Sequence, residues 1–120
     1  MTIDPATPYC YLTTTGRVSG EPREIEIWFA LNDGTLYLLA GSGEKAHWVR
    51  NLRKTPVVRV RIGATTYPAA GRVVTDPAED ALARRLLVEK YQPTYKRSLV
   101  EWGRTALPVA LDLPGPHRPL

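Results

Sequence analysis

Short runs in which apolar and polar residues alternate are the feature that most limits what this 120-residue sequence can fold into. In the clearest run every second residue is apolar, since Ile25, Ile27, Phe29 and Leu31 alternate with Glu24, Glu26 and Trp28. This period of two is typical of a β-strand with one face against a core. The Asn32-Asp33-Gly34 segment that follows is a strong hairpin signal.

The same reasoning along the chain predicts a β-rich α+β fold. Alternation and turn signals predict six strands, at 9–15, 23–31, 35–40, 57–62, 66–74 and 106–113. Helical spacing predicts helices at 44–54, 77–91 and 95–102, the last ended by Gly103. Six short strands close most simply into a small barrel, because closure removes exposed sheet edges. We expect one domain, residues 1–120, with tails at 1–8 and 114–120.

Composition narrows the location and the chemistry. Cys10 is the only cysteine and lies in an apolar run, which favours a buried, inert thiol and a reducing compartment. Residues 1–8 lack the pattern of a secretory signal, and no apolar stretch approaches the ~20 residues that a membrane-spanning helix needs. We therefore expect a cytoplasmic protein without membrane insertion. His47 and His117 form no cluster with metal-ligand spacing, so we expect no metal and no metal-dependent hydrolysis.

The formal net charge of +4 favours an anionic partner, such as a cofactor phosphate, a nucleic acid or an acidic lipid. Ser42 and Gly43 lie where a strand ends and a helix begins, and Lys45 follows in the first turn, an arrangement suited to an anion. His47 and Asn51 share a face of that helix, beside Trp48. Alternatively, the tryptophan belongs to the core and both polar residues face solvent.

Two further groups of polar residues are candidates for anion binding. The threonines before Gly16, together with Arg17, provide hydroxyl and guanidinium donors that suit a phosphate, although an ordinary strand and turn would have the same sequence. Arg59, Arg61 and Arg72 lie on two strands expected to pair. They suit either a nucleic-acid surface or, more simply, a solvated barrel face.

Two ordered motifs resemble a known family. Residues 12–23, LTTTGRVSGEPR, are similar to the TTGRxSGxPR segment of the deazaflavin-dependent nitroreductases and quinone reductases. Residues 39–52, LAGSGEKAHWVRNL, resemble that family's small-residue loop followed by W-x-x-N-L. The spacing of Tyr91, Tyr95 and Arg104 is similar to its C-terminal part, so the resemblance covers residues 12–113.

The resemblance implies a Greek-key split β-barrel related to pyridoxamine-phosphate-oxidase-like flavoproteins, assembled as a homodimer. It implies an oxidoreductase that uses the reduced deazaflavin coenzyme F420 to pass hydride to a small electron-poor acceptor, such as a quinone, a nitroaromatic or an activated alkene. Tyr91 and Tyr95 would line the acceptor pocket, and either can donate a proton there. The implied cofactor-binding residues are Thr15, Arg17, Arg23, Trp28, Ser42, Gly43, Lys45, His47, Trp48 and Asn51.

The sequence departs from the family pattern in two places. Val18 stands where many members carry a basic residue, and Gly43 stands where a lysine is common in a longer loop. These departures leave FMN, a shorter phosphorylated cofactor, as an alternative, either in a reductase or in a flavin or deazaflavin carrier without turnover. A nucleic-acid-binding barrel is the third alternative, and we expect no nucleic acid as partner.

Overall fold

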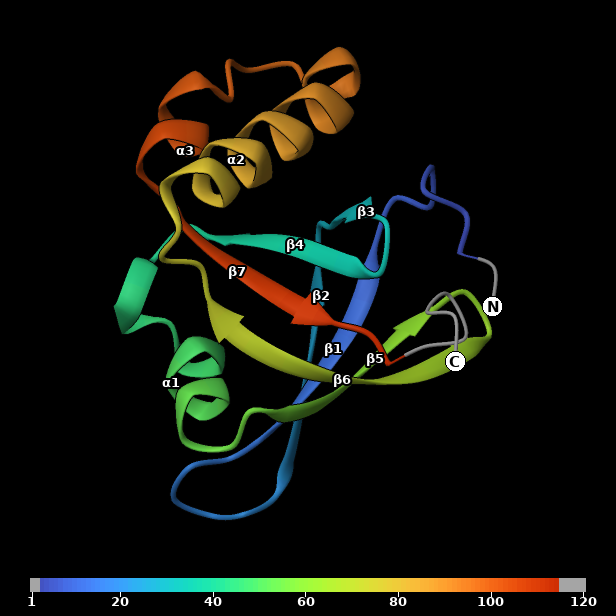
Figure 1. Ribbon diagram of the computed structural model, residues 1–120, viewed down its shortest axis with the longest axis vertical. Helices are drawn as coiled ribbons and strands as arrows, with labels where there is room; N and C mark the ends of the chain where they lie inside the picture. The colour runs from blue at the N-terminus through green and yellow to red at the C-terminus, as the bar shows by residue number, and fades with distance from the viewer. Residues whose placement is uncertain (1–2, 115–120) are drawn as a thin grey trace.

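The computed structural model describes residues 3–114, which form one curled antiparallel sheet and a few short helices (Figure 1). The strands are β1 (Cys10–Thr15), β2 (Pro22–Ile27), β3 (Ala30–Asn32), β4 (Thr35–Ala40), β5 (Val57–Ile62), β6 (Thr65–Val73) and β7 (Leu107–Asp112). The α-helices are α1 (His47–Lys54), α2 (Pro77–Tyr91) and α3 (Val100–Thr105), and the 3₁₀ turns are η1 (Gly43–Lys45) and η2 (Gln92–Thr94).

The strand order in the sheet is β2-β1-β5-β6-β7-β4-β3. Every pair of neighbours is antiparallel. The sheet curls into a half-barrel, so the split-barrel prediction is confirmed, although there are seven strands and not six. Figure 1 shows α2 and α3 together beyond β4, whereas α1 lies near the loop that joins β1 to β2.

The extra strand arises because the predicted strand 23–31 is broken at Trp28 and Phe29. The Tyr91 hydroxyl lies at this break, 3.0 Å from the Phe29 amide nitrogen and 3.1 Å from its carbonyl oxygen. The backbone there bonds to a side chain in place of a neighbouring strand, which ends β2 and turns the chain into β3. The alternation of residues 23–31 continues through the break and gave no sign of it.

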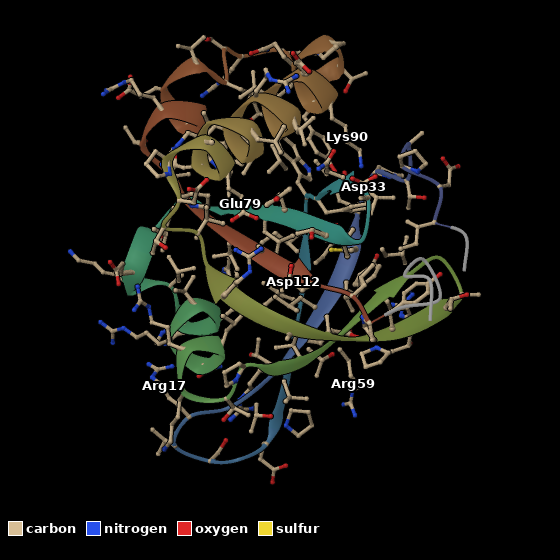
Figure 2. All side chains as sticks on the ribbon, in the orientation of Figure 1. Arg17, Asp33, Arg59, Glu79, Lys90 and Asp112 are labelled. Carbon is tan, nitrogen blue, oxygen red and sulfur yellow. The ribbon has the colours of Figure 1, made fainter. Side chains whose placement is uncertain are left out.

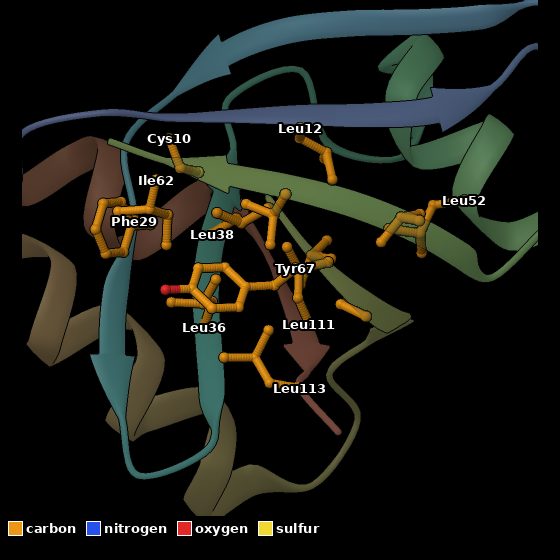
Figure 3. Packing of buried hydrophobic residues seen from close by; sticks show 14 of the residues in the cluster. Cys10, Leu12, Phe29, Leu36, Leu38, Leu52, Ile62, Tyr67, Leu111 and Leu113 are labelled. Carbon is orange, nitrogen blue, oxygen red and sulfur yellow. The ribbon is translucent and has the colours of Figure 1, made fainter. Parts of the chain in front are cut away.

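Two clusters of buried side chains lie on opposite faces of the sheet. The larger cluster fills the inside of the curl and includes Leu12, Phe29, Leu38 and Leu111 (Figure 3). The smaller cluster joins the sheet to α2 through side chains such as Leu87. Each strand that separates the clusters is therefore buried on both faces, as the burial of nearly all of β4 shows.

The helices begin and end for identifiable reasons, and one of them differs from its prediction. Asp76 caps α2 by accepting a hydrogen bond from the Glu79 amide, with Pro77 in the first turn, as the sequence predicted. The predicted helix 95–102 is instead α3, which contains Gly103 and does not end there. A Cβ on Gly103 would lie 2.5 Å from Cγ2 of Val88, so this glycine permits the close approach of α3 to α2.

The N-terminal segment is attached to the end of α2. Lys90 Nζ donates to the Thr7 carbonyl, and the Tyr91 hydroxyl donates to the Pro8 carbonyl. Residues 3–8 of the predicted 1–8 tail thus pack on the body of the protein, while 115–120 of the predicted C-terminal tail lie outside the described residues. None of the helices in the described part is long and apolar enough to cross a membrane.

Candidate functional site

Two adjoining hollows form a cleft between the β1–β2 loop and α1, which we term the basic cleft. One hollow, with a volume of about 500 Å³, is lined by Arg17, Arg23 and Asn51. The other is lined by Ser42 and Lys45 of the loop after β4. Ile25, His47 and Trp48 line both hollows and make them continuous.

Arg17 is held at the centre of the basic cleft, where Figure 2 shows it beside α1. Its Nη1 donates to Asn51 Oδ1 at 2.9 Å and to the His47 carbonyl at 3.4 Å. Its Nη2 lies 3.1 Å from His47 Nδ1. These contacts join the loop to the first two turns of α1, so the two motifs predicted to share a ligand do lie together.

The loop that carries Arg17 folds back tightly at Gly16. The Gly16 amide donates to the Glu21 carbonyl, and a Cβ on Gly16 would lie 2.6 Å from Ser19 Oγ. The same hydroxyl accepts a hydrogen bond from Arg23 Nη2. A side chain at position 16 would therefore displace the Ser19 hydroxyl from Arg23, and the turn brings Arg17 and Arg23 to the same cleft.

A separate hollow, which we term the aromatic pocket, lies between Trp28, where the strand is broken, and residues 95–102. Its volume is about 560 Å³, and Trp28, Tyr95 and Trp102 contribute its aromatic wall. The rings of Tyr95 and Trp102 each meet Trp28 edge to face, at centroid distances of 5.4 and 5.6 Å. Arg97 also lines this pocket.

Tyr91 supports the aromatic pocket from behind. Its ring stacks on Trp28 with centroids 4.2 Å apart and planes 4° apart. Only 6% of Tyr91 is exposed, and its hydroxyl is bonded to the backbone at Pro8 and Phe29. Burial raises the pKa of this hydroxyl to about 12. These contacts occupy the group that the sequence prediction assigned to proton donation, so Tyr91 is placed to position Trp28 and not to reach an acceptor.

Tyr95, the other predicted catalytic residue, is 44% exposed and lines the aromatic pocket. Trp28, predicted among the cofactor-binding residues, also lies in this pocket and not in the basic cleft. The residues predicted to form one site are thus divided between the basic cleft and the aromatic pocket. They adjoin along β2, where Ile25 lines the cleft and Ile27, on the same face of the strand, lines the pocket. They also adjoin where the Trp102 indole packs over Gly41.

The loop after β4 differs from the predicted start of a helix. Gly43 and Lys45 belong to η1, and Ala46 then takes an extended conformation before α1 begins at His47. Ser42 and Lys45 still line the basic cleft. Gly43 has a positive φ of 62°, so it supplies the turn that this loop needs.

Thr15 is the predicted residue that points away from the basic cleft. Successive strand residues face opposite sides, so Thr14 faces inward with Leu12 while Thr15 lines a hollow with Arg59. Thr14 lines the cleft and its hydroxyl accepts a hydrogen bond from Asn51 Nδ2. The alternation that placed Leu12 in the core was the signal that favours Thr14 over Thr15.

Lys90 and Trp102 are residues of these regions that the sequence analysis did not select. Lys90 Nζ donates to the carbonyls of Thr7 and Phe29 and lies 3.7 Å from the centre of the Phe29 ring. Burial lowers the pKa of Lys90 to about 8.

The exposed arginines considered for a nucleic-acid surface are partly engaged elsewhere, since Arg72 pairs with Glu79 and Asp112.

A family model described as F420H(2)-dependent quinone reductase matches residues 2–114. Solved structures with the same fold include one described as an F420-H2 dependent reductase. It is 22% identical, with 93% of this chain and 99% of that chain covered and a TM-score of 0.71.

Two other solved structures extend this comparison. One, described as a domain-swapped dimer, is 23% identical, with 88% of this chain and 80% of that chain covered and a TM-score of 0.72. The other, a putative pyridoxamine 5′-phosphate oxidase from Listeria innocua, is 13% identical, with 89% and 84% covered and a TM-score of 0.67. At these identities the matches show a shared split-barrel fold.

Proposed function

The chain belongs to the F420H₂-dependent quinone reductase family, and we propose that the basic cleft and the aromatic pocket bind the two reactants of the family's reaction. Members of the family are oxidoreductases that reduce electron-poor acceptors, and their cofactor is coenzyme F420. In our proposal the basic cleft binds the anionic end of the cofactor and the aromatic pocket binds the acceptor. The bound, reduced deazaflavin supplies a hydride, and the protein orients the two molecules.

The observation that carries this proposal is a group of cations without anionic partners. Among residues 3–114, no carboxylate forms an ion pair with Arg17, Arg23 or Lys45, and all three line the basic cleft. Unpaired cations that converge on one cleft favour a ligand with phosphate or carboxylate groups. Trp48 and Ile25 add an apolar wall, as a ligand with both a charged tail and a ring system requires.

The aromatic pocket suits a flat acceptor. Trp28 and Trp102 present ring surfaces, against which a quinone or a nitroaromatic can pack. An acceptor that has gained a hydride must also gain a proton. In our proposal the hydroxyl of Tyr95, a residue that lines this pocket, donates the proton, with solvent as the final source.

The adjoining positions of the two hollows support a single site. Hydride transfer requires donor and acceptor to lie in contact, and Ile27 of the pocket follows Ile25 of the cleft on the same face of β2. In our proposal the cofactor ring therefore lies toward this junction, with Trp28 beside it. The acceptor lies on the far side, against Tyr95 and Trp102.

We also propose that the protein is a homodimer in the cytoplasm. A relative with the same fold is described as a domain-swapped dimer. Tyr11 and Arg59 lie on the outward face of β1 and β5, which offers a surface for a second copy. The buried free thiol of Cys10 suits a reducing compartment. Light scattering on the purified protein, with a mass near twice 13.4 kDa expected, tests the dimer.

Titration of the protein into oxidised F420, followed by the cofactor's fluorescence, tests the proposed cofactor site. We expect saturable binding that weakens as salt is raised, and consumption of F420H₂ when menadione is added. Arg17→Ala is expected to weaken binding, with Arg59→Ala as the matched control because Arg59 lies outside the basic cleft. Equal affinity in Arg17→Ala and the parent would contradict the site, and binding of FMN in place of F420 would contradict the cofactor.

A further inference from the structure

Asn51 is a buried polar residue whose side-chain oxygen and nitrogen both form hydrogen bonds within the protein. Only 4% of it is exposed. Its Oδ1 accepts hydrogen bonds from the amide of Arg17 at 3.1 Å and from Nη1 of Arg17 at 2.9 Å. Its Nδ2 donates to Thr14 Oγ1 at 3.2 Å. One side chain of α1 thus fixes both the backbone and the guanidinium of Arg17.

Lys54, one turn further along α1, completes the attachment. Its Nζ donates to the carbonyl oxygen of Arg17 at 2.8 Å. Both backbone polar groups of Arg17 are therefore bonded to side chains of one helix, 34 and 37 residues away in sequence. A turn residue held in this way has little freedom to move, although it lies next to Val18, which is 95% exposed.

The guanidinium of Arg17 retains donors for a ligand. A guanidinium has five N–H groups and no acceptor. Three of those of Arg17 point to Asn51 Oδ1, the His47 carbonyl and His47 Nδ1. Two, one of them on Nε, have no hydrogen-bond partner among the described residues. Because a guanidinium can only donate, the contact with His47 is a hydrogen bond in the tautomer in which Nδ1 accepts.

We propose that Asn51 is a positioning residue. It strengthens cofactor binding only by holding Arg17 in place, and it makes no contact with the cofactor. This inference rests on the proposed function of the basic cleft. Asn51, Lys54 and His47 hold the Arg17 guanidinium in one orientation before the ligand arrives, with its two free N–H groups directed to an anionic oxygen. Binding then does not pay for the ordering of a long, flexible side chain, which otherwise weakens affinity.

A double-mutant cycle on the affinity for oxidised F420 tests this inference without any need for turnover. Arg17→Ala is expected to raise Kd about 10- to 100-fold, as the loss of charge-assisted hydrogen bonds does. Asn51→Ala is expected to raise it about tenfold. The double variant is expected to bind within about twofold of Arg17→Ala alone, since Asn51 has nothing to position once Arg17 is absent.

The salt dependence of Kd provides a second readout, which a merely structural role of Asn51 would not change. The slope of log Kd against log salt is expected to fall in Arg17→Ala and to fall partly in Asn51→Ala, because the positioned charge has been lost or released. Asn51→Leu, which fills a similar volume without the hydrogen bonds, gives the same comparison if the alanine variant folds poorly. Thermal unfolding of each variant checks that the folded protein is being measured.

Lys54 offers a matched pair of variants on the same helix. Lys54→Met removes the hydrogen bond to the Arg17 carbonyl and is expected to raise Kd about threefold. Arg53→Met removes an equal charge from the neighbouring position, where the side chain pairs with Glu44 and makes no bond to Arg17. It is expected to change Kd by less than about 1.5-fold, so a loss of charge alone is distinguished from a loss of positioning.

The outcomes separate this inference from the function on which it rests. If F420 fails to bind, or binds Arg17→Ala as tightly as the parent, the proposed cofactor site is wrong. If Arg17→Ala weakens binding but Asn51→Ala and Asn51→Leu do not, or if their effects multiply in the double variant, the site stands and Asn51 is not a positioning residue.

Discussion

The basic cleft and the aromatic pocket lie next to each other but are held in shape by different forces. In the cleft, Arg17 is fixed by hydrogen bonds from one helix, and the ligand-facing groups are charged. In the pocket, Trp28 is fixed by a stacked ring and two edge-to-face contacts, and aromatic rings share the wall with Glu26 and Arg97. We propose that this difference reflects a division of function, in which the cleft binds the charged cofactor and the pocket binds flat acceptors.

The two regions are also supported by different parts of the core. The cleft is backed by Val49 and Leu52 of α1, which belong to the cluster inside the curl of the sheet. The pocket is backed by the smaller cluster under α2, which includes Tyr91 and Leu99. Changes in one region should therefore leave the other largely intact.

Trp28→Ala is expected to have the largest effect. It removes the ring that meets Tyr91, Tyr95 and Trp102, and loss of a packed tryptophan costs about 3 kcal/mol of unfolding free energy. The KM for menadione should rise, while the Kd for F420 should rise less than in Arg17→Ala. Denaturant unfolding and steady-state kinetics measure the two. An unchanged KM for the acceptor would break the assignment of the pocket.

Tyr91→Phe is expected to cost about 1–2 kcal/mol of stability, because the Phe29 amide would lose its buried hydrogen-bond partner. The phenylalanine keeps the ring that stacks on Trp28. We expect kcat to remain within about threefold of the parent, since the hydroxyl does not reach the acceptor. Tyr95→Phe is the companion variant, and a larger drop in kcat for Tyr91→Phe than for Tyr95→Phe would reverse their roles.

The pH dependence of the free energy of unfolding is expected to show the titration of Lys90. Its pKa is about 8 in the folded protein and 10.5 in the reference state, so the unfolded chain binds more protons between these values. The contribution of Lys90 to stability is therefore lowest below pH 8 and grows as the pH rises to 10.5. After allowance for its partial exposure, this change is about 1 kcal/mol.

Cys10 opposes this trend, because its pKa of about 12 in the folded protein lies above its reference value of 9.0. Its contribution to stability is lost as the pH rises through that range. The difference between the parent and Lys90→Met reports the titration of the lysine together with its coulombic effect on Cys10, whose pKa the lysine lowers. Thermal unfolding at pH 7, 8, 9 and 10 should give a difference that changes steadily with pH, and a constant difference would show that Lys90 does not titrate in this window.

Thr14 and Thr15 provide the smallest and most local test. Thr14→Val removes the acceptor for Asn51 Nδ2 and is expected to raise the Kd for F420 about threefold to fivefold. Thr15→Val, on the opposite face of β1, is expected to change Kd by less than about twofold. Equal effects of the two substitutions would mean that the inward face of β1 is not part of the cleft.

The sequence was sufficient for most of the fold because alternation and turn residues determine strands locally. It predicted β4 and β5 at their observed bounds and the Asp76 cap of α2. It missed the break at Trp28, because that break depends on the Tyr91 hydroxyl, which is distant in sequence. It also predicted that Gly103 ends a helix, whereas Gly103 lies within α3 and permits close packing against Val88.

For the candidate site, the two motifs selected segments that lie in contact in the structure, but they did not predict the contacts of individual side chains. Arg17, His47 and Asn51 were predicted to act together, and they do lie in contact. The hydrogen bond between Arg17 and Asn51 joins residues that are 34 positions apart, and spacing along the sequence does not predict such a contact. The choice between Thr14 and Thr15 could have been made from the alternation of β1.

The three tryptophan indole N–H resonances offer the most direct test of the division between the hollows. The Trp48 ring lines the basic cleft and the Trp102 ring lines the aromatic pocket. In ¹H–¹⁵N spectra, oxidised F420 is expected to shift the Trp48 signal, and menadione added afterwards is expected to shift that of Trp102. A Trp48 signal that stays fixed while F420 binds, or one that responds to menadione in place of Trp102, would contradict the account.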